Sequence, residues 1–222
     1  MTFAKEFEPM PAVWGVGRVM VAGEVVPWPV SEADIVDETD IAEQHYRALG
    51  LADDDLVLVV ALLSQAIHAV PLEAGAGRVG ALYSSADATR FDAFRTASLI
   101  RQLQAKVVIG VDAEVVTGLD DLERDLSDVF GSVAAVVAAD ATAFARLTDA
   151  GLPTGRWLRL GPTSAVSVPG EDALAYDATR WQVDEDGGAL VLTNLAERFT
   201  PCDRFHTGVR GSVPEPGKLL LS

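Results

Sequence analysis

The residues of this sequence best suited to chemistry lie close together near its C-terminal end. Cys202, Asp203 and His206 fall within five positions, and a thiol beside an imidazole can be activated as a nucleophile. Activation also requires an oriented hydrogen bond between base and thiol, which closeness in the sequence does not guarantee. We therefore assign no firm catalytic residue, and we keep His206 and Cys202 as candidates.

The glycine-rich string at residues 75–80 (GAGRVG) matches the dinucleotide-binding pattern G-x-G-x-x-G. In that pattern the glycines follow a strand and open a helix, whose N-terminus then meets a pyrophosphate. Here the string comes after Pro71, at the end of an expected helix, and leads into a strand. We interpret it as a helix-to-strand loop. The patterns G-x-x-x-x-G-K-[ST] and G-x-S-x-G, typical of phosphate-binding loops and of α/β-hydrolases, do not occur.

Metal binding has little support in the sequence. His45, His68 and His206 are scattered, and neither a cysteine nor a second histidine stands at ligand spacing. The three aspartates at residues 53–55 are interpreted as the end of one element and the start of a strand. We predict no metal site and no cofactor.

The composition excludes several classes of partner. The chain has 17 Lys and Arg against 33 Asp and Glu, a formal net charge of −16, and its field repels nucleic acid and anionic lipid. The longest apolar run, residues 56–63, is far shorter than the ~20 residues of a membrane helix. The N-terminus lacks the apolar region of a secretory signal, and the single cysteine forms no internal disulfide. We expect a cytoplasmic protein that binds neither nucleic acid nor membrane.

Apolar runs and helical patterns alternate along the first two thirds of the chain. Residues 56–63 (LVLVVALL), 106–110 (KVVIG) and 132–138 (SVAAVVA) are typical of strands covered on both faces. Strands that alternate with helices of about 10–15 residues imply an α/β protein with a doubly wound, mostly parallel sheet. Helices are expected at residues 41–50, from residue 64 to an interruption at Pro71, and over 87–104, 120–130 and 140–150.

We divide the chain into three parts. Residues 1–40, rich in proline and acidic residues, are expected to form an extended N-terminal arm. Residues 41–151 form the α/β core, and residues 152–222 form a small β-rich portion packed on it. In this last part, Asp186-Gly187-Gly188 is a hairpin turn signal. The arm and an open sheet edge are surfaces that favour a homodimer.

Residues 190–211 (LVLTNLAERFTPCDRFHTGVRG) carry a family resemblance. They resemble the late core of acyl-adenylate-forming enzymes, particularly the phenylacetate-CoA ligase branch of the acyl-CoA and aryl-CoA ligases, with its pattern LVLTNL…R…P…RYRTGD. Arg198 and Pro201 keep their spacing, and residues 204–208 fit R-[YF]-x-T-G. Residues 56–110 resemble the N-terminal subdomain of these enzymes less specifically. The resembling segments cover about half of the chain.

The sequence departs from that family at three points. The Ser/Thr/Gly-rich loop that holds the ATP phosphates has no counterpart between Gly110 and Thr193. The aspartate that binds the ribose hydroxyls corresponds to Val209, which accepts no hydrogen bond, and an unpaired buried hydroxyl costs ~1–3 kcal/mol. The chain stops at Ser222, close to where the mobile C-terminal domain with its catalytic lysine begins in the family. The resemblance therefore implies a degenerate, truncated relative that is not a self-sufficient ATP-dependent ligase.

We rank three functions. The first is a non-adenylating homologue of acyl-CoA and aryl-CoA ligases that acts as a binding or regulatory protein, or as the assembly partner of a complete ligase or another protein. It would retain a cleft for an acyl or aryl small molecule. The second is an enzyme of altered chemistry on an acyl or aryl carboxylate or thioester, with His206 as general acid or base. The third is an unrelated small-molecule-binding module.

By resemblance, the ligand-binding residues are Arg204, Phe205, Thr207 and Gly208. For Arg204, an ion pair with a nearby acidic residue is the competing interpretation, because exposed and cleft arginines commonly form such pairs.

Overall fold

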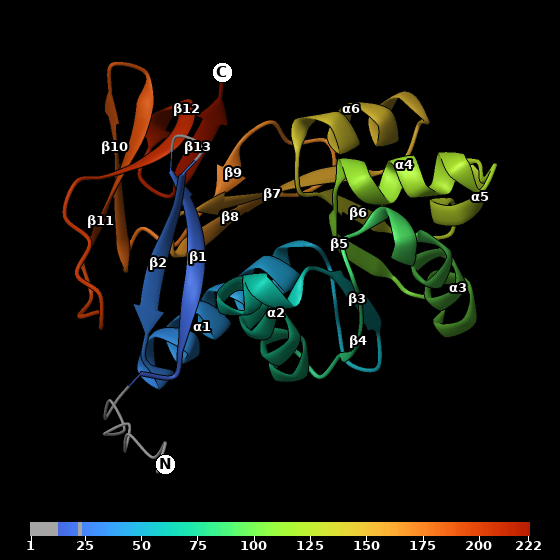
Figure 1. Cartoon of the computed structure of the whole chain (residues 1–222), viewed down its shortest axis with the longest axis horizontal. Coiled ribbons are helices and arrows are strands. Elements are labelled where there is room, and N and C mark those ends of the chain that lie inside the picture. Colours follow the sequence, from blue (N-terminus) through green and yellow to red (C-terminus); the bar gives the residue numbers. More distant parts are fainter. Residues whose placement is uncertain (1–12, 22–23) are drawn as a thin grey trace, which may run out of the picture.

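The computed structural model describes residues 13–21 and 24–222, and its main feature is one long mixed sheet (Figure 1). The strands of this sheet lie in the order β10-β11-β12-β13-β9-β8-β7-β6-β5-β3-β4, and β1 and β2 form a separate pair. The strands are β1 (Gly15–Val21), β2 (Glu24–Val30), β3 (Leu56–Val60), β4 (Leu82–Ala86), β5 (Val107–Val111), β6 (Ala135–Ala138), β7 (Thr154–Leu160), β8 (Thr163–Ser167), β9 (Leu174–Ala175), β10 (Trp181–Asp186), β11 (Ala189–Asn194), β12 (Phe205–Glu215) and β13 (Lys218–Leu221). The α-helices are α1 (Glu32–Ala48), α2 (Ala66–Arg78), α3 (Ala93–Leu103), α4 (Ala113–Asp121), α5 (Leu126–Phe130) and α6 (Ala141–Asp149).

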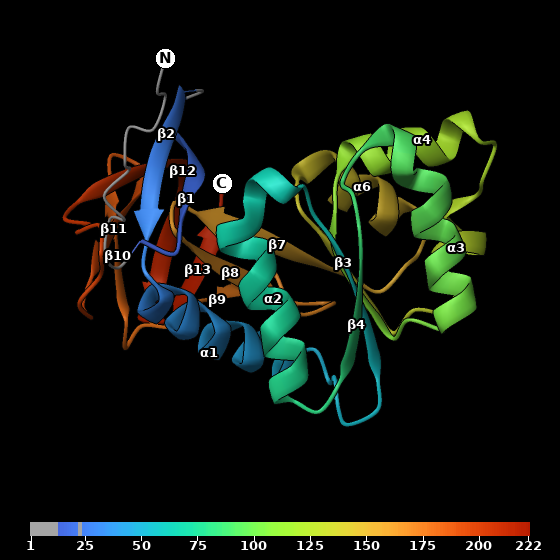
Figure 2. The same ribbon diagram turned by 60° about the horizontal axis from the view of Figure 1, so that its bottom comes forward.

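The strands β4, β3, β5, β6 and β7 are parallel to their neighbours and form the centre of the α/β part. Alternate residues of β3 point to opposite faces, so Val57 and Val59 belong to one apolar cluster, and Leu58 and Val60 belong to another. α1 and α2 cover the first face, and α3, α4, α5 and α6 cover the second (Figure 2). Both faces are buried, which explains why these strands are continuous apolar runs. The predicted α/β fold with a doubly wound, mostly parallel sheet is confirmed.

The direction in which the chain winds changes at β3. This strand connects through α2 to β4 on one side, whereas β4 connects through α3 to β5 on the other side of β3. The connections that leave the carboxyl ends of β3 and β5 therefore pass to opposite faces of the sheet. Open α/β sheets bind ligands outside the carboxyl ends of their strands at such a point.

Beyond β7 the sheet continues with antiparallel strands. β7 pairs with β8, β8 with β9, and β9 with β13, while the long strand β12 pairs with both β13 and β11. Gly187 and Gly188 have φ angles of 59° and 80° and form the turn between β10 and β11, as the turn signal predicted. The sheet continues across residue 151, and the three-part division of the chain stays a prediction.

The N-terminal part differs from the expected extended arm wherever the structure describes it. β1 and β2 form an antiparallel hairpin, and α1 begins at Glu32 instead of residue 41. Ser31 caps α1 by exchanging hydrogen bonds with Asp34, and the acidic first turn complements the helix dipole. The acidic residues assigned to the arm are therefore the start of a helix. Residues 1–12 of the expected arm lie outside the described residues.

Two further helix predictions need correction. Pro71 lies inside α2 and does not interrupt it. The helix predicted over residues 120–130 is instead the end of α4 followed by α5, because Glu123 adopts a left-handed φ of 53° and Asp125 caps a new helix.

The string at residues 75–80 spans the end of α2 and the turn before β4, which confirms its interpretation as a helix-to-strand connection. A Cβ at Gly75 would lie 2.8 Å from the Cβ of Ala42, so this glycine allows α1 and α2 to pack closely.

Candidate functional site

A hollow of about 500 Å³ lies at the carboxyl ends of β3 and β6, where the winding direction changes. β1 and β12 supply its other side, so it lies between the parallel strands and the β-rich half of the molecule. Among the described residues that line it, none is acidic. Its polar side chains come from Arg18, Ser64, Gln65, His68, Arg159 and Thr207.

A second hollow of about 520 Å³ adjoins the first and extends toward α6 and β13. The two hollows share Ala139, Leu158 and Val209. The second hollow adds Arg156 to the lining, together with one carboxylate, Asp140. We refer to the two hollows together as the cleft.

Arg159 is the most unusual charged group of the cleft. Its guanidinium lies 5.5 Å from the ring centre of Trp157 and forms no ion pair with a carboxylate of the described residues. Burial lowers the pKa of Arg159, and the more distant charges of Asp112 and Asp140 offset part of that effect. A buried cation without a counterion is unfavourable unless an anion binds beside it.

The two nearby carboxylates are already engaged with backbone groups. Asp112 accepts a hydrogen bond of 3.0 Å from the N–H of Val115 and caps α4. Asp140 accepts bonds of 2.8 Å from Ala143 and 2.7 Å from Ala113, and caps α6. Both carboxylates therefore serve helix N-termini, as is usual for aspartate at this position.

Two more hydrogen-bond donors beside Arg159 lack partners. The Nε1 of Trp157 and the Nε of Arg156 are buried and donate to no acceptor in the described part of the chain. The guanidinium of Arg156 lies 3.8 Å from the ring centre of Phe144, which holds it against α6. Buried polar groups are normally satisfied, so these two adjacent donors on β7 are open to an acceptor from outside the chain.

His68 lines the cleft as a neutral group. Burial, together with the positive charge of Arg159, lowers the pKa of His68 to about 3, although the carbonyl of Gly161 works in the opposite direction. Its ring packs edge-on against Trp157 with 6.3 Å between ring centres. At neutral pH this imidazole carries no charge, and the cationic lining of the cleft comes from arginine.

The structure separates the four ligand-binding residues expected from the resemblance. Thr207 and Gly208 line the cleft. The Thr207 hydroxyl donates to the carbonyl of Leu190 at 2.8 Å and accepts from the N–H of Val209 at 3.2 Å, which fixes the backbone there. The hydroxyl of Thr207 is therefore already in use, and the neighbouring backbone forms the cleft wall.

Arg204 and Phe205 lie elsewhere. Arg204 is exposed and forms an ion pair with Asp186 at 3.0 Å. This is the arrangement that the competing interpretation of Arg204 described. Phe205 packs edge-on against Trp28, with 5.1 Å between ring centres, and lies close to Gly161. Neither side chain is part of the cleft lining.

Cys202 and His206 have environments unsuited to a nucleophile and its base. The Cys202 thiol is buried and donates to the carbonyl of Leu192 at 3.3 Å, and burial raises its pKa to about 11. His206 is exposed, and no hydrogen bond joins it to Cys202 in the described residues. A neutral thiol of this kind is a structural group.

Sequence reasoning missed the arginines of β7. Arg156 and Arg159 lie in the segment RWLRL of β7, within the portion that was expected only to be β-rich. The sequence feature that could have indicated these residues as part of a site is a pair of arginines on either side of a buried tryptophan in an otherwise apolar strand. Arginine in such a place needs a partner, and no sequence pattern showed that the chain itself supplies none here.

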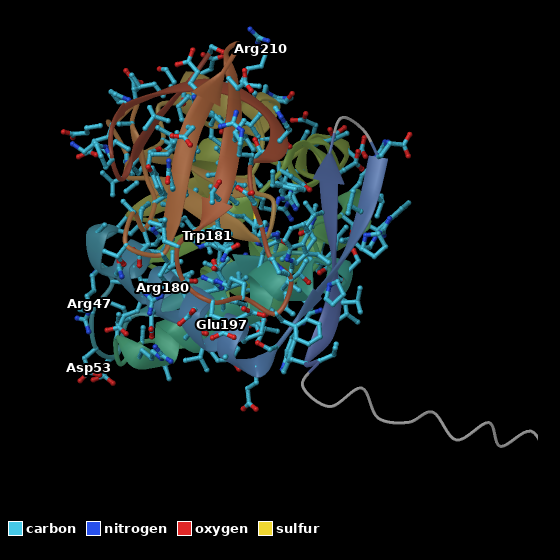
Figure 3. The ribbon with its side chains drawn as sticks, turned by 90° about the vertical axis from the view of Figure 1, so that its left-hand side faces the viewer. Arg47, Asp53, Arg180, Trp181, Glu197 and Arg210 are labelled. Carbon is cyan, nitrogen blue, oxygen red and sulfur yellow. The ribbon has the colours of Figure 1, made fainter. Side chains whose placement is uncertain are left out.

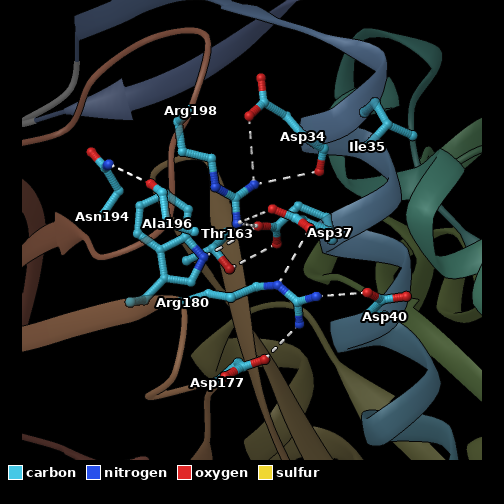
Figure 4. A network of polar contacts seen from close by, with 12 residues as sticks. Asp34, Ile35, Asp37, Asp40, Thr163, Asp177, Arg180, Asn194, Ala196 and Arg198 are labelled. Carbon is cyan, nitrogen blue, oxygen red and sulfur yellow. Dashed lines mark hydrogen bonds and ion pairs between the residues drawn. The ribbon is translucent and has the colours of Figure 1, made fainter.

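A polar network beside α1 contrasts with the cleft (Figure 4). Arg198 contacts Glu38 at 3.0 Å and lies 4.6 Å from the ring centre of Trp181. Glu38 also accepts hydrogen bonds from Thr163 at 2.7 Å and Trp181 at 3.2 Å. Burial raises the pKa of Glu38 to about 7, against the lowering effect of Arg198. The network joins α1 to β8, β10 and the segment before β12.

Arg180 extends this network along α1. It contacts Asp37 at 3.4 Å, Asp40 at 2.6 Å and Asp177 at 3.0 Å. Figure 3 shows Arg180 and Trp181 between the β-rich half and the helices. Arg198, which the resemblance singled out by its spacing, thus belongs to a set of ion pairs that holds two parts of the fold together.

The remaining residues offer no further assembled centre. In residues 13–21 and 24–222, no group of three His, Cys, Asp or Glu side chains is placed so that it could hold a metal ion. Within the same residues, every helix is too short or too polar to cross a membrane.

Several solved structures with this fold are acyl-CoA ligases, whereas no protein-family model and no curated protein matches the sequence. The chain superimposes on 2-hydroxyisobutyryl-CoA ligase in complex with 2-HIB-AMP and CoA with a TM-score of 0.75 and 14% identity, covering 96% of this chain and 56% of that one. For o-succinylbenzoate-CoA synthetase of Bacillus subtilis the TM-score is 0.66, with 11% identity over 96% and 49% of the two chains. For the Mycobacterium tuberculosis fatty acyl-CoA synthetase the TM-score is 0.63, with 12% identity over 93% and 46%.

The chain therefore has the fold found in acyl-CoA ligases, and it spans about half the length of these structures. The resemblance of its sequence to acyl-adenylate-forming enzymes is confirmed at the level of the fold. Identities this low show the fold alone, and a shared fold does not fix a function.

Proposed function

We propose that this protein binds a small anion carrying an acyl or aryl group in the cleft, and that it does so without forming an acyl-adenylate on its own. In this role it acts as a binding or regulatory protein, or as the assembly partner of a complete acyl-CoA ligase. The observation that carries the proposal is Arg159, a half-buried cation of the cleft without an ion pair among the described residues.

The chemistry of the cleft supports an anionic ligand. Arg156 and Trp157 are adjacent on β7 and each hold one buried donor without an acceptor, and Arg159 lies two residues further along the same strand without an ion pair in the described residues. Carboxylates and thioester carbonyls are acceptors, and arginine binds carboxylates through two parallel hydrogen bonds. Such a ligand would satisfy groups that otherwise destabilise the folded chain.

The apolar lining supports an acyl or aryl group on that anion. Leu158, Val209 and Ala139 lie between the two hollows, whose volumes of about 500 and 520 Å³ suit a small molecule. Arginines beside these apolar side chains favour ligands with a charged head and an apolar body.

The side chain of Val209 supports the proposal that this protein does not form acyl-adenylates. This residue lines both hollows at the position where the resemblance places the ribose-binding aspartate. A valine accepts no hydrogen bond from a ribose hydroxyl, and a nucleotide bound here would lose those bonds. Phosphoryl chemistry also needs its charge neutralised by Mg²⁺ and positioned cations.

The competing hypothesis, an enzyme that uses His206 or Cys202, receives no support from their surroundings. His206 is exposed outside the cleft lining, and the Cys202 thiol is buried with a raised pKa.

Isothermal titration calorimetry tests the proposal. The protein is titrated with phenylacetate, octanoate, acetyl-CoA and MgATP in separate experiments. We expect binding of at least one of the first three and none of MgATP. The variant Arg159→Met should weaken that binding by about 10-fold or more, because hydrogen bonds to a charged group contribute about 1.5–3 kcal/mol.

Arg204→Met is the matched control, since it removes an arginine that pairs with Asp186 outside the cleft. Equal affinities for wild type and Arg159→Met, or the absence of binding by every anion, contradict the cleft assignment. Stoichiometric binding of MgATP contradicts the non-adenylating part.

A further inference from the structure

A second hollowed surface lies on α3, α4 and α5, at the end of the molecule far from the β-rich half (Figure 1). It consists of a hollow of about 510 Å³ beside one of about 410 Å³, and the two share Phe94 and Leu122. We call this surface the α3–α5 face. It shares no residue with the cleft.

The α3–α5 face exposes large apolar side chains. Phe91 is 96% exposed, Phe94 60% and Leu122 43%. All three line the smaller hollow. Contiguous exposed apolar groups that surround hollows are typical of protein interaction sites.

Charged side chains of both signs surround these apolar groups. Arg101 and Arg124 line the larger hollow and form no ion pair with the described residues. Glu123 and Asp128 line the same hollow and are also without an ion pair there. Asp125, by contrast, caps α5 by accepting from Ser127 at 2.7 Å.

We propose that the α3–α5 face binds a second copy of this chain about a two-fold axis. A strongly acidic or strongly basic partner would meet repulsion from half of the charges in the hollow. A two-fold axis instead brings the arginines of one copy against the carboxylates of the other, because such an interface is formed by the same surface on both subunits. The apolar side chains then form its centre, and the charged pairs form its rim.

Sedimentation velocity over a range of protein concentrations tests this interface. The wild-type chain should sediment as a concentration-dependent dimer, and Phe91→Ser/Phe94→Ser should sediment as a monomer over the same range. Leu195→Ser/Phe199→Ser is the matched control, because it removes two exposed apolar side chains, 55% and 41% exposed, from another part of the surface. This control should remain dimeric.

Charge reversal tests the two-fold arrangement itself. Arg101→Glu/Arg124→Glu and Glu123→Arg/Asp128→Arg should each be monomeric, since each variant places like charges against each other across the axis. An equimolar mixture of the two should form a heterodimer. Circular dichroism of each variant confirms that it is folded.

Three results would overturn the proposal. These are a wild-type chain that stays monomeric at the highest concentration, a dimer that survives Phe91→Ser/Phe94→Ser, and a charge-reversed mixture that stays monomeric. None of them bears on ligand binding in the cleft, so this inference and the proposed function fail independently.

Discussion

The polar network beside α1 contains a buried arginine and the cleft at the carboxyl ends of the strands contains a half-buried one, and their surroundings differ. In the network, Arg198 is 5% exposed and contacts carboxylates of α1, the nearest being Glu38 at 3.0 Å. In the cleft, Arg159 has its pKa lowered by burial and forms no ion pair with a described carboxylate. The same residue type is therefore compensated by the chain in one place and uncompensated in the other.

This difference separates a structural role from a binding role. Removing one partner of a buried ion pair leaves the other charge without compensation, which is strongly destabilising. A buried cation that lacks a partner already carries that penalty in the ligand-free chain, and an anionic ligand relieves it. Arginines of the first kind stabilise a fold, and those of the second kind mark a site.

The largest expected effect is on the stability of Arg198 and Arg159 variants. Arg198→Met should lower the free energy of unfolding by about 3 kcal/mol, because Glu38 loses its buried counterion. Arg159→Met should leave the free energy of unfolding unchanged or raise it. Urea denaturation at pH 7 measures both, and equal losses for the two variants would remove the distinction between network and cleft.

A smaller effect is expected from acidification, through the neutral histidine of the cleft. The pKa of His68 is lowered to about 3 in the folded chain from its ordinary value of 6.5, so below pH 6.5 the unfolded chain binds more protons. The contribution of the neutral His68 to the free energy of unfolding should therefore be fully present above pH 6.5 and decrease as the pH falls toward 3. The contribution of His68 between pH 7 and pH 5 is about 2 kcal/mol, since one pKa unit corresponds to about 1.4 kcal/mol.

Two other buried groups titrate in this range, so a variant isolates His68. His45, with a pKa lowered to about 4, acts in the same direction, and Glu38, with a pKa raised to about 7, acts in the opposite direction. His68→Gln should show a smaller loss of stability than wild type between pH 7 and pH 5, measured by urea unfolding at both. Identical losses would show that His68 is not held neutral.

The smallest effect is expected at Arg204. Its ion pair with Asp186 joins two exposed side chains, 58% and 52% exposed. Exposed pairs contribute about 0.2–1 kcal/mol. Arg204→Ala should change the free energy of unfolding by about 0.5 kcal/mol or less in urea denaturation. A loss close to that of Arg198→Met would mean that exposure is a poor guide to the role of arginine in this protein.

The fold could be predicted from local patterns more completely than the site. Apolar runs such as residues 106–110 identify strands buried on both faces, and Asp186-Gly187-Gly188 identifies a turn, because both signals depend on neighbouring residues. Helix boundaries were less certain. Ser31 and Asp34 cap α1, but from the sequence they were assigned to an acidic arm. Glu123 separates two helices, and glutamate is not a residue type that predicts such a break.

The candidate site depended on contacts between residues far apart in the chain. Cys202 and His206 are near each other in the sequence, but packing buries one and exposes the other. Thr207, which the family pattern singled out, lies at the start of β12 and lines the cleft, and its role in ligand binding stays a prediction.

The sequence by itself determined the α/β class, the alternation of strands and helices in the core and the acidic character of the chain. These follow from periodicity and composition, which are local or additive properties. The tertiary structure alone decided which arginines have their charge compensated by a carboxylate of the chain. Arg198 meets Glu38 across 160 positions of chain, whereas Arg159 lines the cleft with no such partner among the described residues. Arg159 itself lies on β7, separated from β3 by β6 and β5. Electrostatic compensation depends on distance in space, and only the folded chain sets that distance.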